Sequence, residues 1–354
     1  MASSARAQEL WRDFFRSLHW SFGAAFLFSL AGVGRGAPIW VTTCSFGILM
    51  PLAAVVARMF LAAVRFRSFL LTVVVHSAAM FLFFGGAFLL SISLTIVSAQ
   101  KGGLFSSESW ALVGEIIQHP GVRGPMLGSV GLAFIITAIS KISNKLGPGV
   151  LRNWLTGKYH EPREETRVFM FLDLRDSTTL AEKLGNLKFS ALVRDFFSDM
   201  SQVCFPTKAE VSHYIGDEAV ISWRPDRAKL NTNVLRFVVL FQEKLAENRR
   251  AYEEKYGHVP EFKVGAHMGS VVATEVGESK SEIVFHGDVM NTTARIQQLS
   301  SSLGHDFLIS AELATFLELD PTLYATTDFG LQSLKGKEVP IQVFGINPTK
   351  SVKD

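Results

Sequence analysis

The sequence predicts an α-helical membrane domain followed by an α+β domain, and three observations support this prediction. The mean hydropathy of the 354-residue chain is +0.24, which is high for a soluble protein. Charged residues are sparse before about residue 145 and dense after it, so we expect a membrane half and a soluble half. The soluble half alternates apolar strands with helices, which predicts a sheet covered by helices on one face.

The composition of the chain argues against some partners and compartments. The net charge is only +3, so nothing indicates a nucleic-acid partner. Cys44 lies in an apolar segment and Cys204 in the polar half, so we expect no disulfide between them and a reducing compartment for the soluble half. The N-terminus lacks the pattern of a cleaved signal peptide. Leu10, Phe14 and Leu18 instead predict a cytoplasmic amphipathic helix over residues 1–19.

Residues 20–146 are predicted to form a membrane domain of about four transmembrane helices. Its apolar segments are 20–33, 39–64, 68–97 and 126–142. Basic residues concentrate before the first segment, between the second and third, and after the fourth: Arg6, Arg12, Arg16, Arg58, Arg65, Arg67, Lys141, Lys145, Arg152 and Lys158. Both ends of the chain are therefore expected in the cytoplasm. If one segment were buried or re-entrant, the soluble half would face outward, and the charge pattern opposes this alternative.

A linker is predicted between the two halves, over residues 147–166. A Gly-Pro-Gly sequence at its start breaks the preceding helix, and a charged stretch follows. Any signal sensed in the membrane must pass through this linker. The predicted α+β domain then occupies residues 167–346, and residues 347–354 form a tail.

The elements of the α+β domain follow from its apolar runs and the turns between them. Strands are predicted at 168–173, 208–214, 218–223, 262–268 and 282–286, and helices at 179–203, 228–256 and 289–302. A tight Ile-Gly-Asp-Glu turn joins the second and third strands. The order of these elements is typical of an α+β sandwich.

The first strand of this domain ends on a charge. Val168 to Leu172 is apolar without alternation, which predicts burial on both faces, and Asp173 follows directly. Thr179 and Glu182 fit a capping box, so a helix start that favours phosphate is expected beside this carboxylate. The two anions would repel each other unless a cation such as magnesium lay between them. Taken alone, Asp173 is equally typical of a turn or a helix cap.

Three further polar residues fit the same chemistry. Asp217 follows Gly216 in the tight turn, and two aspartates meeting on one sheet would form a two-metal site for attack at phosphorus. Asn291 and Arg295 are four residues apart on a predicted helix, so they share one face and suit a phosphoryl transition state. Each of these residues alone is more typical of an ordinary turn or a solvated surface.

Together, these segments resemble the catalytic domain of class III adenylate and guanylate cyclases, of the bacterial membrane-anchored type. The family pattern is a strand ending F-x-D-I/L-x-x-S/T, then a G-D hairpin, then G-D-x-V/M-N-x-x-x-R on a helix. This chain has FLDLRDST, IGDE and GDVMNTTAR in that order, and the resemblance covers about residues 165–346, including the late LKGKEVPIQVFGI. It implies a ferredoxin-like βαββαβ core and a cytoplasmic catalytic domain on a multi-pass protein of the inner membrane, surrounded by membrane lipid.

The resemblance also implies roles for individual residues. Asp173, Asp217 and the backbone carbonyl of Leu174 would hold two Mg²⁺ or Mn²⁺ ions per site, and Asn291 and Arg295 would stabilise the transition state. The ribose 3′-hydroxyl of ATP would attack the α-phosphorus and expel pyrophosphate. Further residues are expected to bind substrate: Ser177, Thr178, His213, Val284 and Lys335, with Lys337 as an alternative to Lys335. The family site forms between two chains, which implies a homodimer with two equivalent sites.

Two positions depart from the family pattern. His213 lies four residues before Asp217, where Lys is common, and Val284 lies seven before Asn291, where Asp or Thr is common. His213 can make one hydrogen bond to a base, but the Val284 side chain can make none. Base reading is therefore expected to be loose, or to use the backbone or His286. An adenylyl cyclase is the leading interpretation, ahead of a GTP or pyrimidine nucleotide cyclase and a nucleotide-binding receptor without turnover.

The membrane half carries three histidines that raise the question of haem: His19, His76 and His119. His76 lies within the third apolar segment, where a hydrogen bond to a neighbouring helix is the simpler interpretation. The small residues at 85–87 could allow close helix packing. The signal that this half senses is not identified by the sequence. A channel or transporter is an alternative, which the near absence of intramembrane charge opposes.

Overall fold

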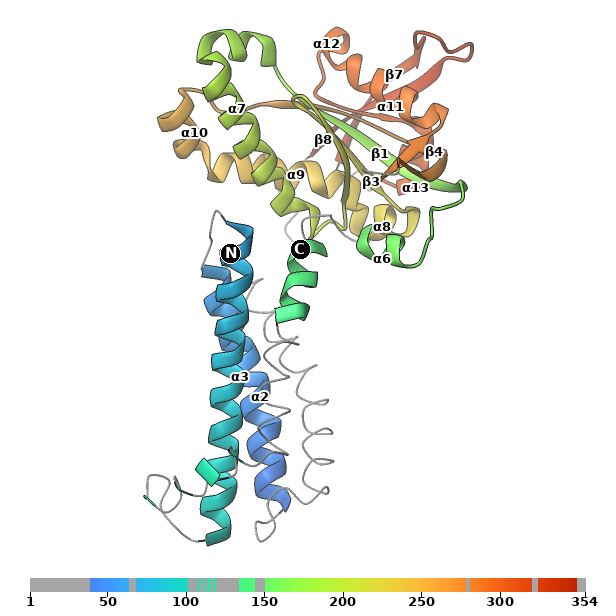
Figure 1. Ribbon diagram of the computed structural model, residues 1–354. Coiled ribbons are helices and arrows are strands. Elements are labelled where there is room, and N and C mark those ends of the chain that lie inside the picture. The colour runs from blue at the N-terminus through green and yellow to red at the C-terminus, as the bar shows by residue number, and fades with distance from the viewer. Residues whose placement is uncertain are drawn as a thin grey trace. The chain divides into compact units, whose positions relative to one another are not determined.

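The computed structural model divides into two compact units, Met1–Leu146 and Gly147–Asp354, and each is described by itself (Figure 1). The structure describes residues 39–63, 68–100, 134–143, 150–277, 281–319 and 324–348, with isolated positions between 107 and 118. The predicted amphipathic helix over residues 1–19 and the predicted span at 20–33 lie outside the described residues.

The first unit is helical where it is described. Helix α2 runs over Ile39–Ala63 and helix α3 over Phe69–Gln100. The two helices pack against each other, with the rings of Phe46 and Phe88 edge to face at a centroid distance of 5.6 Å. Their bounds agree with the predicted segments 39–64 and 68–97.

One described helix is long and apolar enough to cross a membrane. It is Leu70–Thr95, 26 residues long with a mean hydropathy of 2.1. Thr43–Ala57 and Phe134–Ser143 are shorter apolar helices, and the latter is the described part of the predicted span at 126–142. The number of spans therefore stays a prediction.

The histidine and the small residues singled out in the third apolar segment differ in how closely other residues surround them. His76 is buried in α3, whereas His19 and His119 lie outside the described residues. Gly85 and Gly86 have open space where a Cβ would stand. The described residues therefore place no close helix neighbour over these glycines.

The second unit is built on an eight-stranded sheet. Its strands are β1 (Arg163–Leu174), β2 (Glu210–Ile215), β3 (Glu218–Trp223), β4 (Phe262–Val276), β5 (Glu282–His286), β6 (Phe307–Ser310), β7 (Tyr324–Gln332) and β8 (Ile341–Pro348). Its helices are α6 (Val150–Leu155), α7 (Ser177–Cys204), α8 (Pro225–Lys229), α9 (Asn233–Glu247), α10 (Arg249–Tyr256), α11 (Asp288–Gln298), α12 (Ser300–Leu303) and α13 (Ala311–Leu317), with a 3₁₀ turn at Leu230–Thr232.

The strand order is β2-β3-β1-β4-β6-β8-β7, and β5 pairs with β4 beside this path. Neighbouring strands among the first four of the path are antiparallel to each other, and the chain runs β1-α7-β2-β3-α9-β4 through them. This is the expected ferredoxin-like βαββαβ core. Strand β6 then joins β4 in parallel, and β8 and β7 extend the sheet further.

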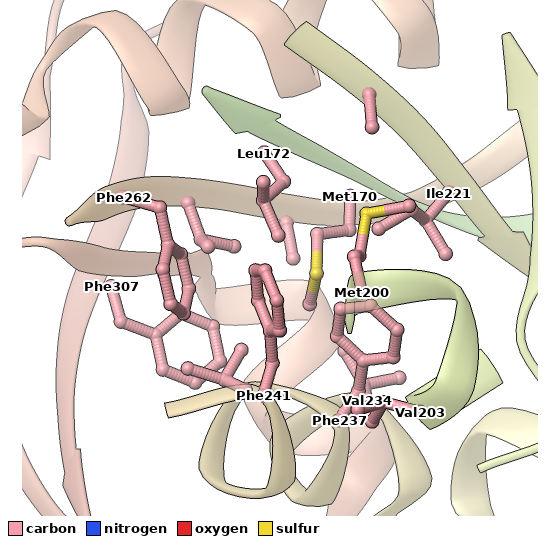
Figure 2. Close-up of a cluster of buried hydrophobic side chains, with 14 of the residues drawn as sticks. Met170, Leu172, Met200, Val203, Ile221, Val234, Phe237, Phe241, Phe262 and Phe307 are labelled. Carbon is pink, nitrogen blue, oxygen red and sulfur yellow. The ribbon is translucent and has the colours of Figure 1, made fainter. Parts of the chain in front are cut away.

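Strand β1 is buried on both faces, as its unbroken apolar run predicts. Met170 and Leu172 pack against buried side chains of α7 and α9, among them Phe241 of α9 (Figure 2). Phe169 and Phe171 point to the other face, where Val289 of α11 covers them. The expectation of helices on one face only is therefore wrong, because a strand that is apolar on both sides requires cover on both.

Two local predictions in this unit are also wrong. Helix α7 begins at Ser177 and not at a capping box formed by Thr179, and its N-cap Asp176 has a left-handed φ of 53° without a side-chain cap. The backbone N–H of Arg175 donates to the Glu261 carbonyl at 2.9 Å, so a tertiary contact sets this turn. The long helix predicted at 228–256 is broken into α8, α9 and α10.

Candidate active site

Two carboxylates meet at one end of the sheet. Asp173 is the penultimate residue of β1, and β3 pairs with β1 so that Glu218 lies opposite Asp173. Asp217 stands in the two-residue turn before Glu218, where Gly216 has a φ of +63°, a conformation that glycine adopts readily. Burial raises the pKa of Asp173; Lys263 opposes this shift and the neighbouring Asp217 adds to it. The structure therefore brings the two predicted metal carboxylates together.

Negative charge is concentrated around these residues. Burial, together with repulsion from Asp173 and Asp217, raises the pKa of Glu218 to about 7, although Lys263 opposes this shift. Lys263 lies opposite Asp173 on β4, the second neighbour of β1, and its Nζ is 3.1 Å from Oδ2 of Asp173. The Nε2 of Gln297 donates to the same oxygen at 3.3 Å.

The donor set fits a hard divalent cation. Mg²⁺ is commonly bound by one or two carboxylates together with substrate phosphates. Among the described residues, no group of three His, Cys, Asp or Glu side chains is arranged to hold an ion alone. Asp173 and Asp217 could thus supply two carboxylates, with other oxygen ligands coming from the backbone or the substrate. Leu174, whose carbonyl is a predicted ligand, directly follows Asp173 and has a buried side chain.

The start of α7 lies directly after this carboxylate. Ser177 is half-buried and Thr178 is exposed, and both belong to the first turn of the helix. The N–H groups of a first helical turn lack intrahelical partners, so they are suited to bind an anion. Arg175, in the turn before, is an exposed side chain that donates to the carboxylate of Asp306 at 3.1 Å.

Helix α11 presents Asn291 and Arg295 on a face that points away from the sheet. Val289 and Ile296 form the buried face of α11, whereas Asn291 is exposed and Arg295 is half-buried. Gln297, which contacts Asp173, is two residues after Arg295 and so projects about 160° away from it around the helix axis. Within one chain, the Asn–Arg pair therefore does not face the carboxylate pair.

The remaining predicted substrate residues are spread over the sheet. His213 is half-buried on β2 and pairs with Val220, and Val284 is half-buried on β5 and pairs with Thr274. Strands β3, β1 and β4 separate β2 from β5, so one chain does not bring His213 and Val284 together.

The two lysines of the β7–β8 connection differ in their surroundings. Lys335 is exposed. Lys337 is half-buried, and its Nζ lies 2.5 Å from Oδ2 of Asp288 at the start of α11. Lys337 therefore ties this connection to the helix that carries Asn291 and Arg295.

Comparison with known proteins identifies the family. Residues 159–347 match the model of the adenylate and guanylate cyclase catalytic domain. The chain belongs to this family. Its sequence is 32% identical to adenylate cyclase 2 of Rhizobium meliloti (strain 1021) over 255 residues, which cover 69% of this chain and 70% of that protein. The chain is therefore a nucleotide cyclase.

Two further matches cover smaller shares of this chain and of the matched protein. The chain is 24% identical to the adenylate cyclase of Anabaena cylindrica over 183 residues, which are 50% of this chain but only 36% of that protein. The solved structure of a bacterial light-regulated adenylyl cyclase superposes with a TM-score of 0.53 at 21% identity, over 64% of this chain and 66% of that one. The likeness to this solved structure concerns the fold alone.

Sequence reasoning missed two residues that contact Asp173, namely Lys263 and Gln297. Lys263 belongs to the segment Phe-Lys-Val-Gly, which was correctly predicted as a strand. Its contact with Asp173 depends on the pairing of β1 with β4, which the sequence pattern does not reveal. Gln297 lies on the same helix as Arg295, two residues further on. This spacing places it on the opposite face of the helix, so the sequence could have indicated that it faces the sheet.

Proposed function

We propose that this cyclase is an adenylate cyclase that converts ATP to cyclic AMP and pyrophosphate in a homodimer. The observation that carries the proposal is the arrangement of two half-sites on one chain. The carboxylates of Asp173 and Asp217 stand at one end of the sheet, and Asn291 and Arg295 stand on a helix face turned away from them. The relatives named adenylate cyclases support ATP as the substrate.

A twofold assembly would unite the half-sites. The carboxylates of one chain would face the Asn291 and Arg295 side chains of its partner, and the symmetry would repeat this arrangement at a second, equivalent site. The same assembly would bring His213 of one chain near Val284 of the other, which the sheet separates within a chain. A fully active monomer would contradict this part of the proposal.

Asp173, Asp217 and the Leu174 carbonyl would hold two Mg²⁺ or Mn²⁺ ions. When bound, these ions would lower the pKa of the ribose 3′-hydroxyl and neutralise charge on the phosphates. The two aspartates are suited to this task because their mutual repulsion favours a cation between them.

The other residues bind and orient the nucleotide. Arg295 would pair with the phosphates as charge shifts to the leaving group, and Asn291 would hold the ribose. The N–H groups at Ser177 and Thr178 would bind phosphate oxygens, and Lys335 would reach the same group. The 3′-hydroxyl would give its proton to solvent water, and its oxygen would form a bond to the α-phosphorus. The bond between the α-phosphorus and the bridging oxygen would break to release pyrophosphate.

A second substrate is favoured by one specific observation. The Val284 side chain cannot hydrogen-bond to a base, and His213 can supply one bond. Selection of adenine by side chains is therefore weaker than a Lys–Asp pair would give. A cyclase acting on GTP or a pyrimidine nucleotide is the alternative function.

The N-terminal unit would anchor the enzyme in the membrane. Leu70–Thr95 has the length and hydropathy of a membrane span, and the basic residues of the sequence favour a cytoplasmic catalytic domain. We place the enzyme in the bacterial inner membrane, with several spans in contact with lipid. These spans would pass a signal of unknown identity through the linker at 147–166.

Turnover by the purified full-length protein tests the proposal. Each of the four nucleoside triphosphates is supplied separately with Mg²⁺ or Mn²⁺, and the products are identified by mass. Cyclic AMP that is lost in Asp173→Ala is the expected result. A different cyclic nucleotide would replace ATP as the substrate and keep the mechanism. No product from any triphosphate, with the dimer intact, would contradict the assignment for the protein as purified.

A further inference from the structure

The carboxylate of Asp173 already has a cationic partner within its own chain. Oδ2 of Asp173 lies 3.1 Å from the Nζ of Lys263, and the two residues are directly opposite each other on β1 and β4. Their side chains are about equally buried, with exposed fractions of 21% and 24%. Gln297 donates to the same oxygen at 3.3 Å. This oxygen is therefore occupied by two donors before any ligand binds.

The position of Lys263 is set by the sheet and not by a mobile loop. It lies in the ladder between β1 and β4, which continues without interruption from Arg163 to Leu174. Its ammonium is the counter-charge of a cluster that includes Asp173, Asp217 and Glu218. The ammonium beside Asp173 makes this cluster less attractive to a divalent cation than the carboxylates alone would be.

We propose that Lys263 is a resident counter-ion that competes with the catalytic metal for Asp173 and thereby sets the affinity of the site for metal in the absence of nucleotide. This inference rests on the proposed metal-binding role of Asp173 and Asp217. The ammonium and a divalent cation cannot both stay beside the same carboxylate oxygen without repulsion, so metal binding displaces the ammonium from Oδ2. Free metal alone then binds weakly, and the negative charge of a nucleotide favours its entry.

Lys263 is a positioning residue, so its test needs a readout besides turnover. Mn²⁺ binding to the full-length dimer without nucleotide is measured from the electron paramagnetic resonance signal of free Mn²⁺. We expect Lys263→Met to bind Mn²⁺ about tenfold more tightly than the wild type, because a cation close to the metal is removed. Lys263→Arg keeps the charge and should bind Mn²⁺ as the wild type does.

A matched control separates the local effect from a change in net charge. Lys244 has an exposed fraction of 25% and pairs with Glu247 at 3.3 Å, away from this cluster. Lys244→Met should leave Mn²⁺ binding unchanged. Lys263→Gln, which keeps a hydrogen-bond donor, replaces the Met variant if that variant fails to fold. Equal or weaker Mn²⁺ binding by the uncharged variants would overturn the proposal.

Asp173→Asn distinguishes the failure of this inference from that of the proposed function. If Asp173→Asn abolishes Mn²⁺ binding and Lys263→Met does not tighten it, the inference alone is wrong. If Asp173→Asn leaves Mn²⁺ binding at the wild-type level, the metal assignment is wrong and the inference falls with it. Tighter binding in Lys263→Met that disappears when Asp173→Asn is added supports both.

Discussion

Strand β1 carries a cation near its start and a carboxylate near its end, and the protein treats the two charges differently. Arg167 is buried, with an exposed fraction of 2%, and two carboxylates neutralise it. Its Nε lies 2.6 Å from Glu165, and its Nη1 lies 2.9 Å from Glu210 and 3.1 Å from the hydroxyl of Ser222. The hydroxyl of Tyr159, from the segment before the strand, accepts a bond from Nη2 at 3.4 Å.

The other end of the strand has charges of one sign in excess. Asp173, Asp217 and Glu218 lie together, and Lys263 provides the ammonium opposite them. The pKa of Asp173 is raised, first by burial, whereas the pKa of Arg167 is raised by its carboxylates although burial alone would lower it. Both groups thus have raised pKa values, a direction that favours the charged form of the arginine and disfavours that of the aspartate.

The difference shows how to distinguish structural from functional charges. A buried ion that is fully paired by its own chain holds elements together, and its loss leaves other charges uncompensated. A cluster of like charges costs stability and is retained where a ligand of opposite charge binds. The two ends of β1 should therefore respond oppositely to substitution, in activity at one end and in stability at the other.

Asp173→Asn should give the largest effect, on activity. We expect turnover to fall by roughly 1000-fold or more, because a ligand of the proposed catalytic cation is lost. The melting temperature of the metal-free protein should change little, because relief of the repulsion from Asp217 offsets the loss of the ion pair with Lys263. Product formation and thermal unfolding of the full chain measure the two effects. Activity within about tenfold of the wild type would contradict the assignment of Asp173.

Arg167→Met should show the reverse pattern. Glu165 and Glu210 would be left without their buried partner, and we expect a loss of about 3–5 kcal/mol in the free energy of unfolding. Denaturant unfolding followed by circular dichroism measures this loss. Arg250→Met is the matched control, because Arg250 is a 91% exposed arginine paired with Glu254. The control should lose less than about 0.5 kcal/mol, and equal losses in both variants would mean that burial of the pair is irrelevant.

Gly265→Ala should reduce both activity and stability, each by less than the two preceding substitutions. A Cβ at Gly265 would lie 2.2 Å from the backbone nitrogen of Gln297, so α11 would have to move away from β4. We expect a loss of about 1–3 kcal/mol and reduced turnover, because α11 carries Asn291 and Arg295. Gly269→Ala is the control, since its Cβ would meet the side chain of Val289 at 3.1 Å. A larger loss in the control would contradict this account of helix packing.

The sequence predicted the parts of the site that depend on local pattern. An unbroken apolar run ending on Asp173, a Gly-Asp turn at Asp217, and the four-residue spacing of Asn291 and Arg295 each lie within one element. The βαββαβ core, in contrast, was implied by the resemblance of these motifs to class III cyclases, because the local pattern alone indicated only an α+β sandwich.

Features that depend on contacts between distant segments were not predicted. The pairing of β1 with β4 brings Lys263 to Asp173, and it continues in the backbone hydrogen bond from Arg175 to Glu261 just before α7 begins. The close approach of α11 over Gly265 likewise depends on how helix and sheet pack. Strands β6, β7 and β8, which extend the sheet beyond β4, were not assigned.

Glu165→Gln should give the smallest effect. It tests whether the folded protein favours the charged form of the carboxyl group at the Arg167 end of β1. Burial alone would raise the pKa of Glu165, but Arg167 and, more weakly, Lys158 lower it below its usual value of 4.5. A carboxylate with a lowered pKa stabilises the fold above that usual value, and this stability is lost as the pH falls through the folded-state pKa. The variant should therefore lose about 1 kcal/mol near neutral pH, and the difference from the wild type should shrink below about pH 4. Unfolding free energies measured across this range check the sign. A difference that grows as the pH falls would mean that the pKa of Glu165 is raised, as that of Asp173 is, and the two ends of the strand would then be alike.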